Sequence, residues 1–143
     1  MSAIETYPMP LFVTLAVADL AASQRWYEAM GFNTVFLMAG PHGAPAFAHM
    51  RWIRYADLLL RPGSAPQGAK GLGLTLNFRV EQDIDSLAQH AKAAGASFHT
   101  EIGDRPWNAR DFTLLDPDGF VLTFTYGPLK QLDFDAVMRD AAF

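Results

Sequence analysis

The sequence predicts an α+β fold made of two tandem βαβββ modules, and three observations predict it. The first is a helical segment that occurs twice, bracketed by Asp19 and Gly31 and then by Asp83 and Gly95. Aspartate is a favourable N-cap, and glycine commonly follows the last helical turn. The second is that strand-like segments surround each helix in the same order. The third is that the spacing from the aspartate to the glycine is the same in both segments, which is the pattern of a duplication.

The first module is expected over about residues 10–61. Residues 11–17 are a run of apolar and β-branched residues typical of a buried strand, and a helix over 20–30 follows the Asp19 cap. Residues 32–38 predict a second strand, and 40–45 a loop rich in glycine and proline. Segments 46–53 and 57–61 complete the module as a hairpin pair.

A linker over 62–71, rich in Pro, Gly and Ser, separates this module from a second one over about 72–126. Its predicted strands are 72–80, 96–102, 111–115 and 120–126, with one helix capped by Asp83. The turn Asp116-Pro117-Asp118-Gly119 joins the last two strands, because proline fixes φ, aspartate bonds nearby amides and glycine accepts positive φ. The tail, 127–143, contains an amphipathic stretch from 132 onward, expected to pack on the sheet or on a partner.

Composition narrows the possible functions. A chain of 143 residues, half of them apolar, is expected to form one domain. The net charge of −4 argues against a nucleic-acid-binding surface. The absence of cysteine excludes disulfides, thiolate catalysis and Cys-ligated metals. No segment has the length of a membrane span or the pattern of a signal peptide, so we expect a soluble cytoplasmic protein with no membrane partner.

The two modules resemble the vicinal oxygen chelate superfamily, which includes glyoxalase I, extradiol dioxygenases, fosfomycin-modifying enzymes and bleomycin-resistance proteins. The resemblance rests on Val17-Ala18-Asp19-Leu20, on Trp26-Tyr27-Glu28-Ala29-Met30-Gly31-Phe32 and on the Asp116–Gly119 turn. It covers nearly the whole chain and implies a single domain over 1–143, with a cupped mixed sheet.

The segment 101–112 is similar to the bleomycin-resistance branch, which has a Pro-Trp-Gly loop before an arginine or acidic residue and a phenylalanine. Pro106 and Trp107 match that loop, whereas Asn108-Ala109 replace the usual glycine. This likeness implies a homodimer with ligand grooves between subunits and an exchanged N-terminal strand. Pro8 and Pro10 provide a stiff segment that favours such an exchange.

Catalytic members of the superfamily hold a divalent ion with His, Gln or Glu at four strand positions. By register these fall at or beside Phe12, among 58–60, at or beside Thr75, and on Thr123. None of these residues is a strong ligand for a divalent cation. We therefore expect no metal, no cofactor and no catalytic residue. A rival interpretation is a glyoxalase-like lyase or dioxygenase with a non-standard metal site at His49, Asp57 and Asn77.

Without a metal, a concave apolar surface still binds ligands by burying them against aromatic rings. The candidate binding residues are Trp107, Phe36, Phe47, His49, Trp52, Asp104 and Asp111. The aromatic residues would stack on a planar guest, and acidic groups near the rim, Glu101 included, favour a cationic one. Sheet packing is the alternative role of Phe36, Phe47 and Trp52, and a hydrogen-bonded strand residue that of His49. The leading hypothesis is sequestration of a cationic aromatic antibiotic or related metabolite; a family member that serves another small molecule remains an alternative.

Overall fold

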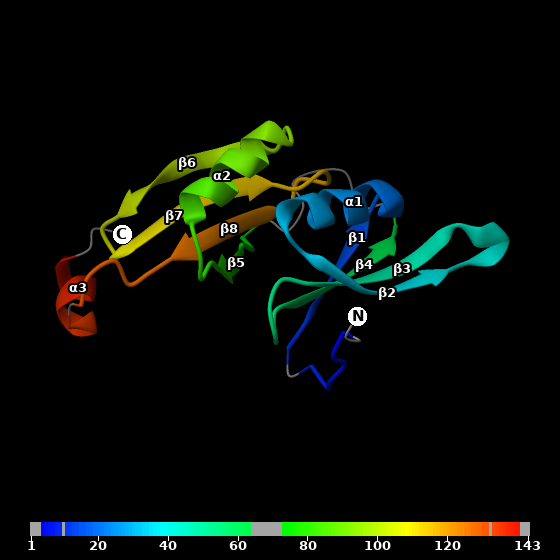
Figure 1. Cartoon of the computed structure of the whole chain (residues 1–143), viewed down its shortest axis with the longest axis horizontal. Coiled ribbons are helices and arrows are strands. Elements are labelled where there is room, and N and C mark those ends of the chain that lie inside the picture. The colour runs from blue at the N-terminus through cyan, green and yellow to red at the C-terminus, as the bar shows by residue number, and fades with distance from the viewer. Residues whose placement is uncertain (1–3, 10, 64–72, 132, 141–143) are drawn as a thin grey trace. The chain divides into compact units, whose positions relative to one another are not determined.

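The structure is a computed structural model that describes residues 4–9, 11–63, 73–131 and 133–140. The chain divides into two compact units, residues 1–70 and 71–143, so the division falls at the end of the predicted linker. Most of that linker, residues 64–71, lies outside the described residues. Figure 1 labels the elements of both units, and each unit is described by itself below.

Unit 1 contains a four-stranded mixed sheet and one long helix (Figure 1). Its elements are β1 (Val13–Val17), α1 (Leu20–Met30), β2 (Asn33–Ala39), the 3-10 turn η1 (Pro41–Gly43), β3 (Pro45–Arg51) and β4 (Asp57–Pro62). The strand order is β1-β4-β3-β2; β1 runs parallel to β4, and the other pairs are antiparallel. This is the predicted βαβββ order.

Unit 2 repeats this topology. Its elements are β5 (Leu76–Arg79), α2 (Ile84–Ala93), β6 (Ser97–Arg105), β7 (Ala109–Leu115), β8 (Val121–Tyr126) and α3 (Phe134–Asp140). The strand order is β5-β8-β7-β6, with β5 parallel to β8. The prediction of an α+β fold with two tandem βαβββ modules is confirmed.

The helix boundaries follow from the caps that the sequence supplies. The carboxylate of Asp19 accepts a hydrogen bond from the amide of Ala22 at 3.0 Å, and that of Asp83 accepts one from Ser86 at 3.2 Å. Each bond satisfies an amide that has no partner within the helix. Gly31 ends α1 with φ +111, a conformation that glycine adopts without a side-chain penalty.

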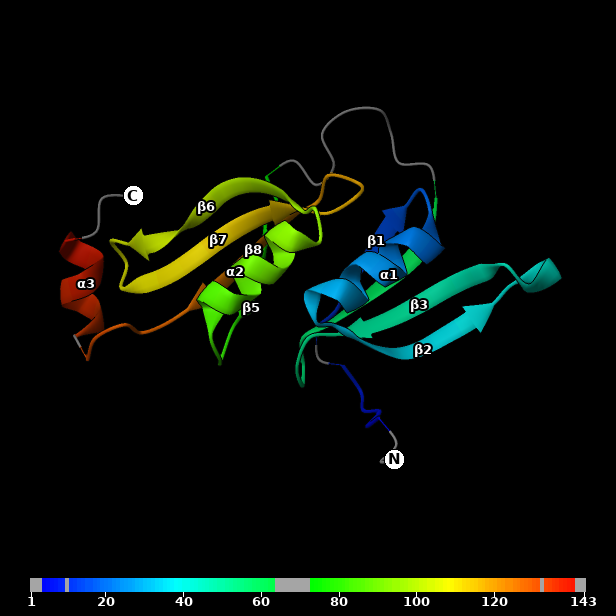
Figure 2. The same ribbon diagram turned by 45° about the horizontal axis from the view of Figure 1, so that its top comes forward.

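Each sheet is covered on one face by its helix, as Figure 2 shows for α1 and α2. In unit 1, α1 contacts β3 and β4, and Tyr27 and Met30 of the helix are fully or almost fully buried, as are Ala48, Met50 and Leu60 of the strands. In unit 2, three phenylalanine rings form the equivalent core: Phe124 stacks on both Phe78 and Phe112, with ring centroids 5.4 Å apart in each pair. Because side chains alternate along a strand, the residues between these core positions lie on the opposite, open face.

Several predicted boundaries differ from the observed ones. The first strand begins at Val13 rather than at residue 11, and the strand expected over 72–80 is observed as Leu76–Arg79, with residue 72 outside the described part. Strands β6 and β7 extend further than predicted, to Arg105 and from Ala109, because a tight turn over 106–108 joins them. The tail forms α3; residues 132 and 141–143 of that prediction lie outside the described residues.

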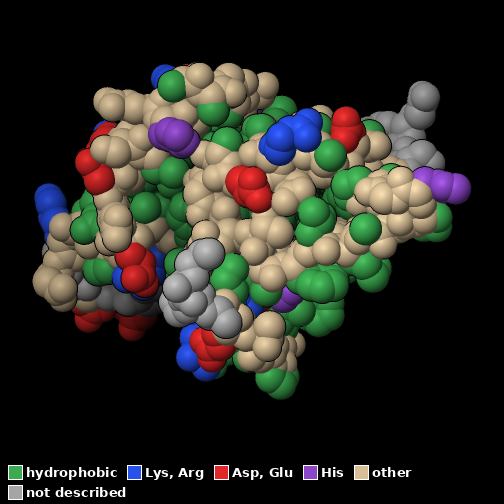
Figure 3. Space-filling model, turned by 45° about the vertical axis from the view of Figure 1, so that its right-hand side comes forward, with side chains coloured by type: hydrophobic (Ala, Val, Ile, Leu, Met, Phe, Trp, Pro, Cys, Tyr) green, Lys and Arg blue, Asp and Glu red, His purple; other side chains and the backbone are tan. Residues whose placement is uncertain are grey.

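The surface seen in Figure 3 carries acidic and basic side chains interspersed with apolar ones, and neither sign gathers into one large patch on this face. Among the described residues, none of the helices combines the length and the hydropathy that crossing a membrane requires.

Candidate functional site

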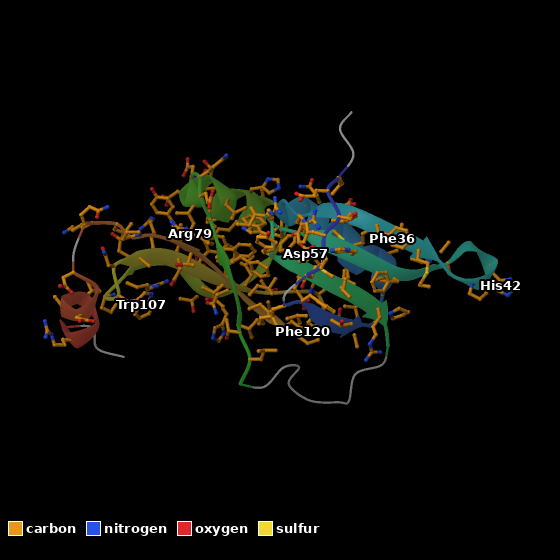
Figure 4. The ribbon with its side chains drawn as sticks, turned by 90° about the horizontal axis from the view of Figure 1, so that it is seen from below. Phe36, His42, Asp57, Arg79, Trp107 and Phe120 are labelled. Carbon is orange, nitrogen blue, oxygen red and sulfur yellow. The ribbon has the colours of Figure 1, made fainter. Side chains whose placement is uncertain are left out.

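Trp107 lies at the turn between β6 and β7, beside α3 in Figure 4. The amide of Asn108 donates to the carbonyl of Arg105 at 3.2 Å and closes the turn. Asn108 has φ +63, a left-handed conformation that asparagine tolerates better than most residues. Asparagine can therefore occupy the position where the bleomycin-resistance branch has glycine. Trp107, the preceding residue, is 37% exposed.

The open face of the unit 2 sheet carries two rows of polar side chains next to this turn. One row crosses the strands as Arg79, Thr125 and Asp111, which are paired in register. The second row lies two residues away along each strand and consists of Asn77, Thr123, Thr113 and Thr100. The hydroxyls of Thr113 and Thr123 are hydrogen-bonded at 2.7 Å. This second row thus forms a floor of hydroxyl and amide groups beside the first row, which contains the charged Arg79 and Asp111.

Two cavities meet at Trp107 and Thr125. One, of about 350 Å³, lies over the floor and is lined by Asn77, Thr100, Arg105, Trp107, Asp111, Thr113, Thr123 and Thr125. The other, of about 420 Å³, is lined by Arg79, Trp107, Asn108, Ala109, Thr125, Gly127, Pro128 and Val137. Trp107 is the aromatic wall that both share, which makes this region of unit 2 the candidate site.

The acidic residues expected to attract a cation are all engaged in ion pairs. Asp111 is buried and pairs with Arg105 at 2.7 Å; Asp104, exposed, pairs with Arg110 at 2.9 Å. Glu101 pairs with Lys92 at 2.6 Å. Each pair brings a positive charge next to the carboxylate and so weakens its attraction for a cationic guest.

Arg110 forms ion pairs with two carboxylates, Asp85 of α2 at 2.7 Å and Asp104 at 2.9 Å. Its hydrogen bonds to these two carboxylates raise the pKa of Arg110. The carboxylate of Asp116 accepts the amides of Asp118 and Phe120, at 2.9 and 2.8 Å, within its own turn.

Three of the candidate residues of unit 1 share the open face of its sheet, and one does not. Phe36 of β2 is the register partner of His49 on β3, and Phe47 lies two residues from His49 on the same face. Trp52 packs against Phe32, with ring centroids 5.2 Å apart, and against the backbone of Gly31. Trp52 therefore has a packing contact at the end of α1, while Phe36, Phe47 and His49 are together.

His49 belongs to a buried polar network centred on Asp57. The side chain of Asp57 is 1% exposed; it accepts two hydrogen bonds from Arg51 at 2.9 Å and lies 2.7 Å from Nε2 of His49. Tyr7 adds a donor at 3.2 Å. Burial alone would raise the pKa of Asp57, but the hydrogen bonds from Arg51 and His49 outweigh it, so the pKa lies below its usual value. The ionised carboxylate can only accept, so Nε2 of His49 carries the proton.

The residues at the strand positions where the superfamily binds its metal do not fit a divalent ion. Leu59 and Thr123 occupy equivalent central positions, because Leu59 pairs with His49 and Thr123 with Thr113 in the two sheets. A leucine and a threonine stand where the superfamily places acidic ligands. The alternative ligand set, His49, Asp57 and Asn77, fits no better, since both carboxylate oxygens of Asp57 are already hydrogen-bonded. Within the described residues, no group of three or more His, Asp or Glu side chains is placed to hold a metal.

Sequence reasoning missed most of the polar floor. As ligand-binding residues it named Trp107 and Asp111, which the structure brings to adjoining cavities, but not the threonines of β6, β7 and β8, nor Arg79. One signal was available: Thr113, Thr123 and Thr125 alternate with buried apolar residues, which marks them as one face of a sheet.

The fold and the sequence together define the class of this protein. The sequence matches the profile described as "Glyoxalase/Bleomycin resistance protein/Dioxygenase superfamily" over residues 10–124. The chain therefore belongs to this superfamily. No protein of curated function has significant sequence similarity to the chain.

Solved structures share the fold at low sequence identity. TioX from Micromonospora sp. ML1 is 22% identical, with a TM-score of 0.67, and the match covers 81% of this chain and 96% of TioX. A glyoxylase/bleomycin resistance protein/dioxygenase domain from Frankia sp. EAN1pec is 24% identical, with a TM-score of 0.66 and coverage of 86% and 93%. The fosfomycin resistance protein FosX from Listeria monocytogenes is 14% identical, with a TM-score of 0.66 and coverage of 85% and 95%.

Proposed function

We propose that this protein binds a planar aromatic small molecule against Trp107 and holds it without turnover, as a homodimer of the bleomycin-resistance type. The observation that carries the proposal is that Trp107, 37% exposed, lines two adjoining cavities, one of which lies over the floor of hydroxyl and amide groups. Both cavity volumes lie within the roughly 300–1,000 Å³ typical of small-molecule sites. A stacked ring gains about 0.5–1.5 kcal/mol beyond area burial.

The floor favours a guest whose edge carries hydrogen-bonding groups. Threonine hydroxyls both donate and accept, and the amide of Asn77 does the same. The cavity between Trp107 and Val137 is lined by one charged side chain, Arg79, which is positive. The guest that this geometry supports best is therefore neutral or carries an acidic group.

A cationic aromatic antibiotic is the second candidate. A third cavity, of about 410 Å³, lies next to the turn, and its lining includes Asp104 and Asp133. Asp104 keeps 67% of its side chain exposed despite its pair with Arg110. A cationic group that extends past the turn would meet these carboxylates.

Binding without turnover is supported by the chemistry of the residues around Trp107. Threonine and asparagine are weak acids and bases, and Asp111 is held in an ion pair with Arg105. A general base needs a pKa near the working pH and access to the proton that it removes. Asp111, the carboxylate in the lining of the two cavities at Trp107, is buried, which restricts its access to such a proton.

The homodimer is supported by β2, which is one of the two edge strands of the unit 1 sheet. Three consecutive apolar residues of this strand, Phe36, Leu37 and Met38, are each more than 40% exposed. The strand has no charged residue and no proline, the usual protections of a free sheet edge. Covering this edge with a second copy would remove an aggregation-prone surface from water.

The test is a fluorescence titration with planar probes of different charge: 9-anthracenecarboxylate, proflavine and metal-free bleomycin. We expect saturable quenching by at least one probe, with a Kd weakened about tenfold in Trp107→Ala. Trp26→Phe, a change in α1, is the matched control and should keep the wild-type Kd. Equal affinities of the Trp107→Ala variant and the wild type would contradict the proposal, and so would stoichiometric retention of a divalent metal by the purified protein.

A further inference from the structure

The segment after β8 lies beyond the part of the chain that matches the superfamily, which ends at residue 124. The described part of this segment, residues 127–131 and 133–140, is called the C-terminal wall below. It contributes Gly127, Pro128 and Val137 to the lining of the cavity that also holds Trp107. Figure 4 shows Trp107 beside α3, the helical part of this segment. Part of the candidate site is therefore built by residues outside the profile match.

The C-terminal wall is attached to the Trp107 turn through Asn108. The side-chain amide of Asn108 donates to the carbonyl of Lys130 at 2.8 Å, and its oxygen accepts from the amide of Lys130 at 3.1 Å. The amide of Leu129 also donates to the carbonyl of Asn108 at 3.1 Å. These three bonds tie the wall to the residue next to the indole.

A close backbone approach fixes the start of the wall. A Cβ placed on Gly127 would lie 3.0 Å from the carbonyl oxygen of Asn108 and 3.4 Å from Cα of Ala109. Glycine is the residue that permits two backbones to approach so closely. The wall and the turn therefore pack as one piece, without a side chain between them.

Val137 lies at the centre of this arrangement. It lines the cavity that Trp107 and Pro128 also line, and it lines the third cavity, together with Leu129 and Ala136. An apolar side chain between two cavities limits how far a ligand stacked on Trp107 can extend from one into the other.

From this geometry we infer that the C-terminal wall is the specificity element of the Trp107 site, and that Val137 sets the size of the aromatic ligand. This inference rests on the proposed function, because it concerns the same site. It adds residues that lie outside the superfamily match and makes ligand size a property of α3.

The absence of cysteine from the chain permits a specific test in the full-length protein. The variant Val137→Cys places a single thiol at the cavity. Arg139→Cys is the matched control, because Arg139 is exposed on the same helix and lines neither cavity. Each thiol is first reacted with a nitroxide, a short-range quencher of tryptophan emission, in the absence of any ligand.

The nitroxide on V137C should quench the share of emission that Trp107→Phe removes, and the nitroxide on R139C should quench it much less. In a second arm, unlabelled variants react with a maleimide with and without saturating 9-anthracenecarboxylate. Bound probe should slow the reaction of V137C about tenfold and leave R139C unchanged. In a third arm, Val137→Phe should weaken binding of a probe wider than anthracene about tenfold more than binding of 9-anthracenecarboxylate.

The outcomes separate the two proposals. Selective quenching without binding of any probe would refute the proposed function but retain the placement of the wall. Trp107-dependent binding with equal maleimide rates for V137C in both conditions, or with Val137→Phe acting equally on both probes, would overturn the inference about the wall. Melting temperatures of all variants within a few degrees of the wild type exclude unfolding as the cause.

Discussion

Asp57 is the residue whose replacement we expect to destabilise the protein most clearly. Its carboxylate is 1% exposed and accepts hydrogen bonds from Arg51, His49 and Tyr7. Oδ2 of Asp57 accepts from two donors, Nε2 of His49 and Nη2 of Arg51. In Asp57→Asn an amide NH2 group replaces one of the two carboxylate oxygens, so at that position a donor faces other donors. The guanidinium of Arg51, itself 9% exposed, loses its neutralising charge.

Breaking one side of a buried ion pair costs about 3–5 kcal/mol, because the remaining charge stays buried. We expect Asp57→Asn to lower the free energy of unfolding by about 3 kcal/mol, since asparagine keeps the shape and one acceptor. For a chain of this size, that corresponds to a melting temperature lower by about 10 °C. Urea unfolding followed by circular dichroism measures the difference.

The pH dependence has a defined sign. Because the folded pKa of Asp57 lies below its usual value, the carboxylate stabilises the folded state fully above the unfolded pKa, near 4. That stabilisation is lost as the pH falls through 4 and then through the lower folded pKa. The difference between wild type and Asp57→Asn should therefore be constant near neutral pH and shrink in acid.

Asp104→Asn is the matched control, because Asp104 also pairs with an arginine, at 2.9 Å, but is 67% exposed. An exposed pair contributes about 0–1 kcal/mol, so this variant should unfold almost like the wild type. Equal costs for the two substitutions, or a difference for Asp57→Asn that stays constant down to pH 3, would refute the argument from burial.

Three further predictions concern a turn, a helix end and an interface. Asp116→Ala removes the acceptor of two amides and should cost about 2 kcal/mol in urea unfolding, whereas Asp116→Asn should retain most of that stability. Gly31→Ala should cost about 1–2 kcal/mol, because φ is +111 and the new Cβ would lie 3.2 Å from Trp52; Gly119→Ala, with φ +91 and no atom within 4 Å, should cost less in the same assay. Leu37→Lys should convert the proposed dimer to monomer in analytical ultracentrifugation without lowering the melting temperature, and a dimer that persists would place the interface elsewhere.

The fold was predictable because local signals and tertiary packing agree. Asp19 and Asp83 cap the helices as expected, and the Asp116 turn forms with Gly119 at φ +91. These signals lie within a few residues of the structure that they specify. The exact strand ends were not predictable, because they depend on pairing partners distant in the sequence. Strand β1, for example, begins where Val13 meets Leu58.

The candidate site was predictable only in part, for a related reason. Trp107 was indicated by the motif around it, whereas the partners of Asp104, Asp111 and Glu101 were not. An ion pair depends on which side chains the fold brings within about 4 Å, and several basic residues competed for each carboxylate. The attachment of Asn108 to Lys130, over 22 positions, carries no local signal at all.

The two modules show how the duplicated scaffold can separate folding from function. The cross-strand pair His49 and Leu59 in unit 1 corresponds to the pair Thr113 and Thr123 in unit 2. The neighbouring positions that face the helix are large and apolar in both units: Met50 follows His49, and Leu114 follows Thr113. Because the open face contributes little to the helix-side core, its residues could change while each sheet stayed folded. One open face now holds the Asp57 network, and the other holds the hydroxyl floor beside Trp107. The caps and cores therefore identify the superfamily, whereas the residues of the proposed ligand site lie on a face that folding leaves free to vary.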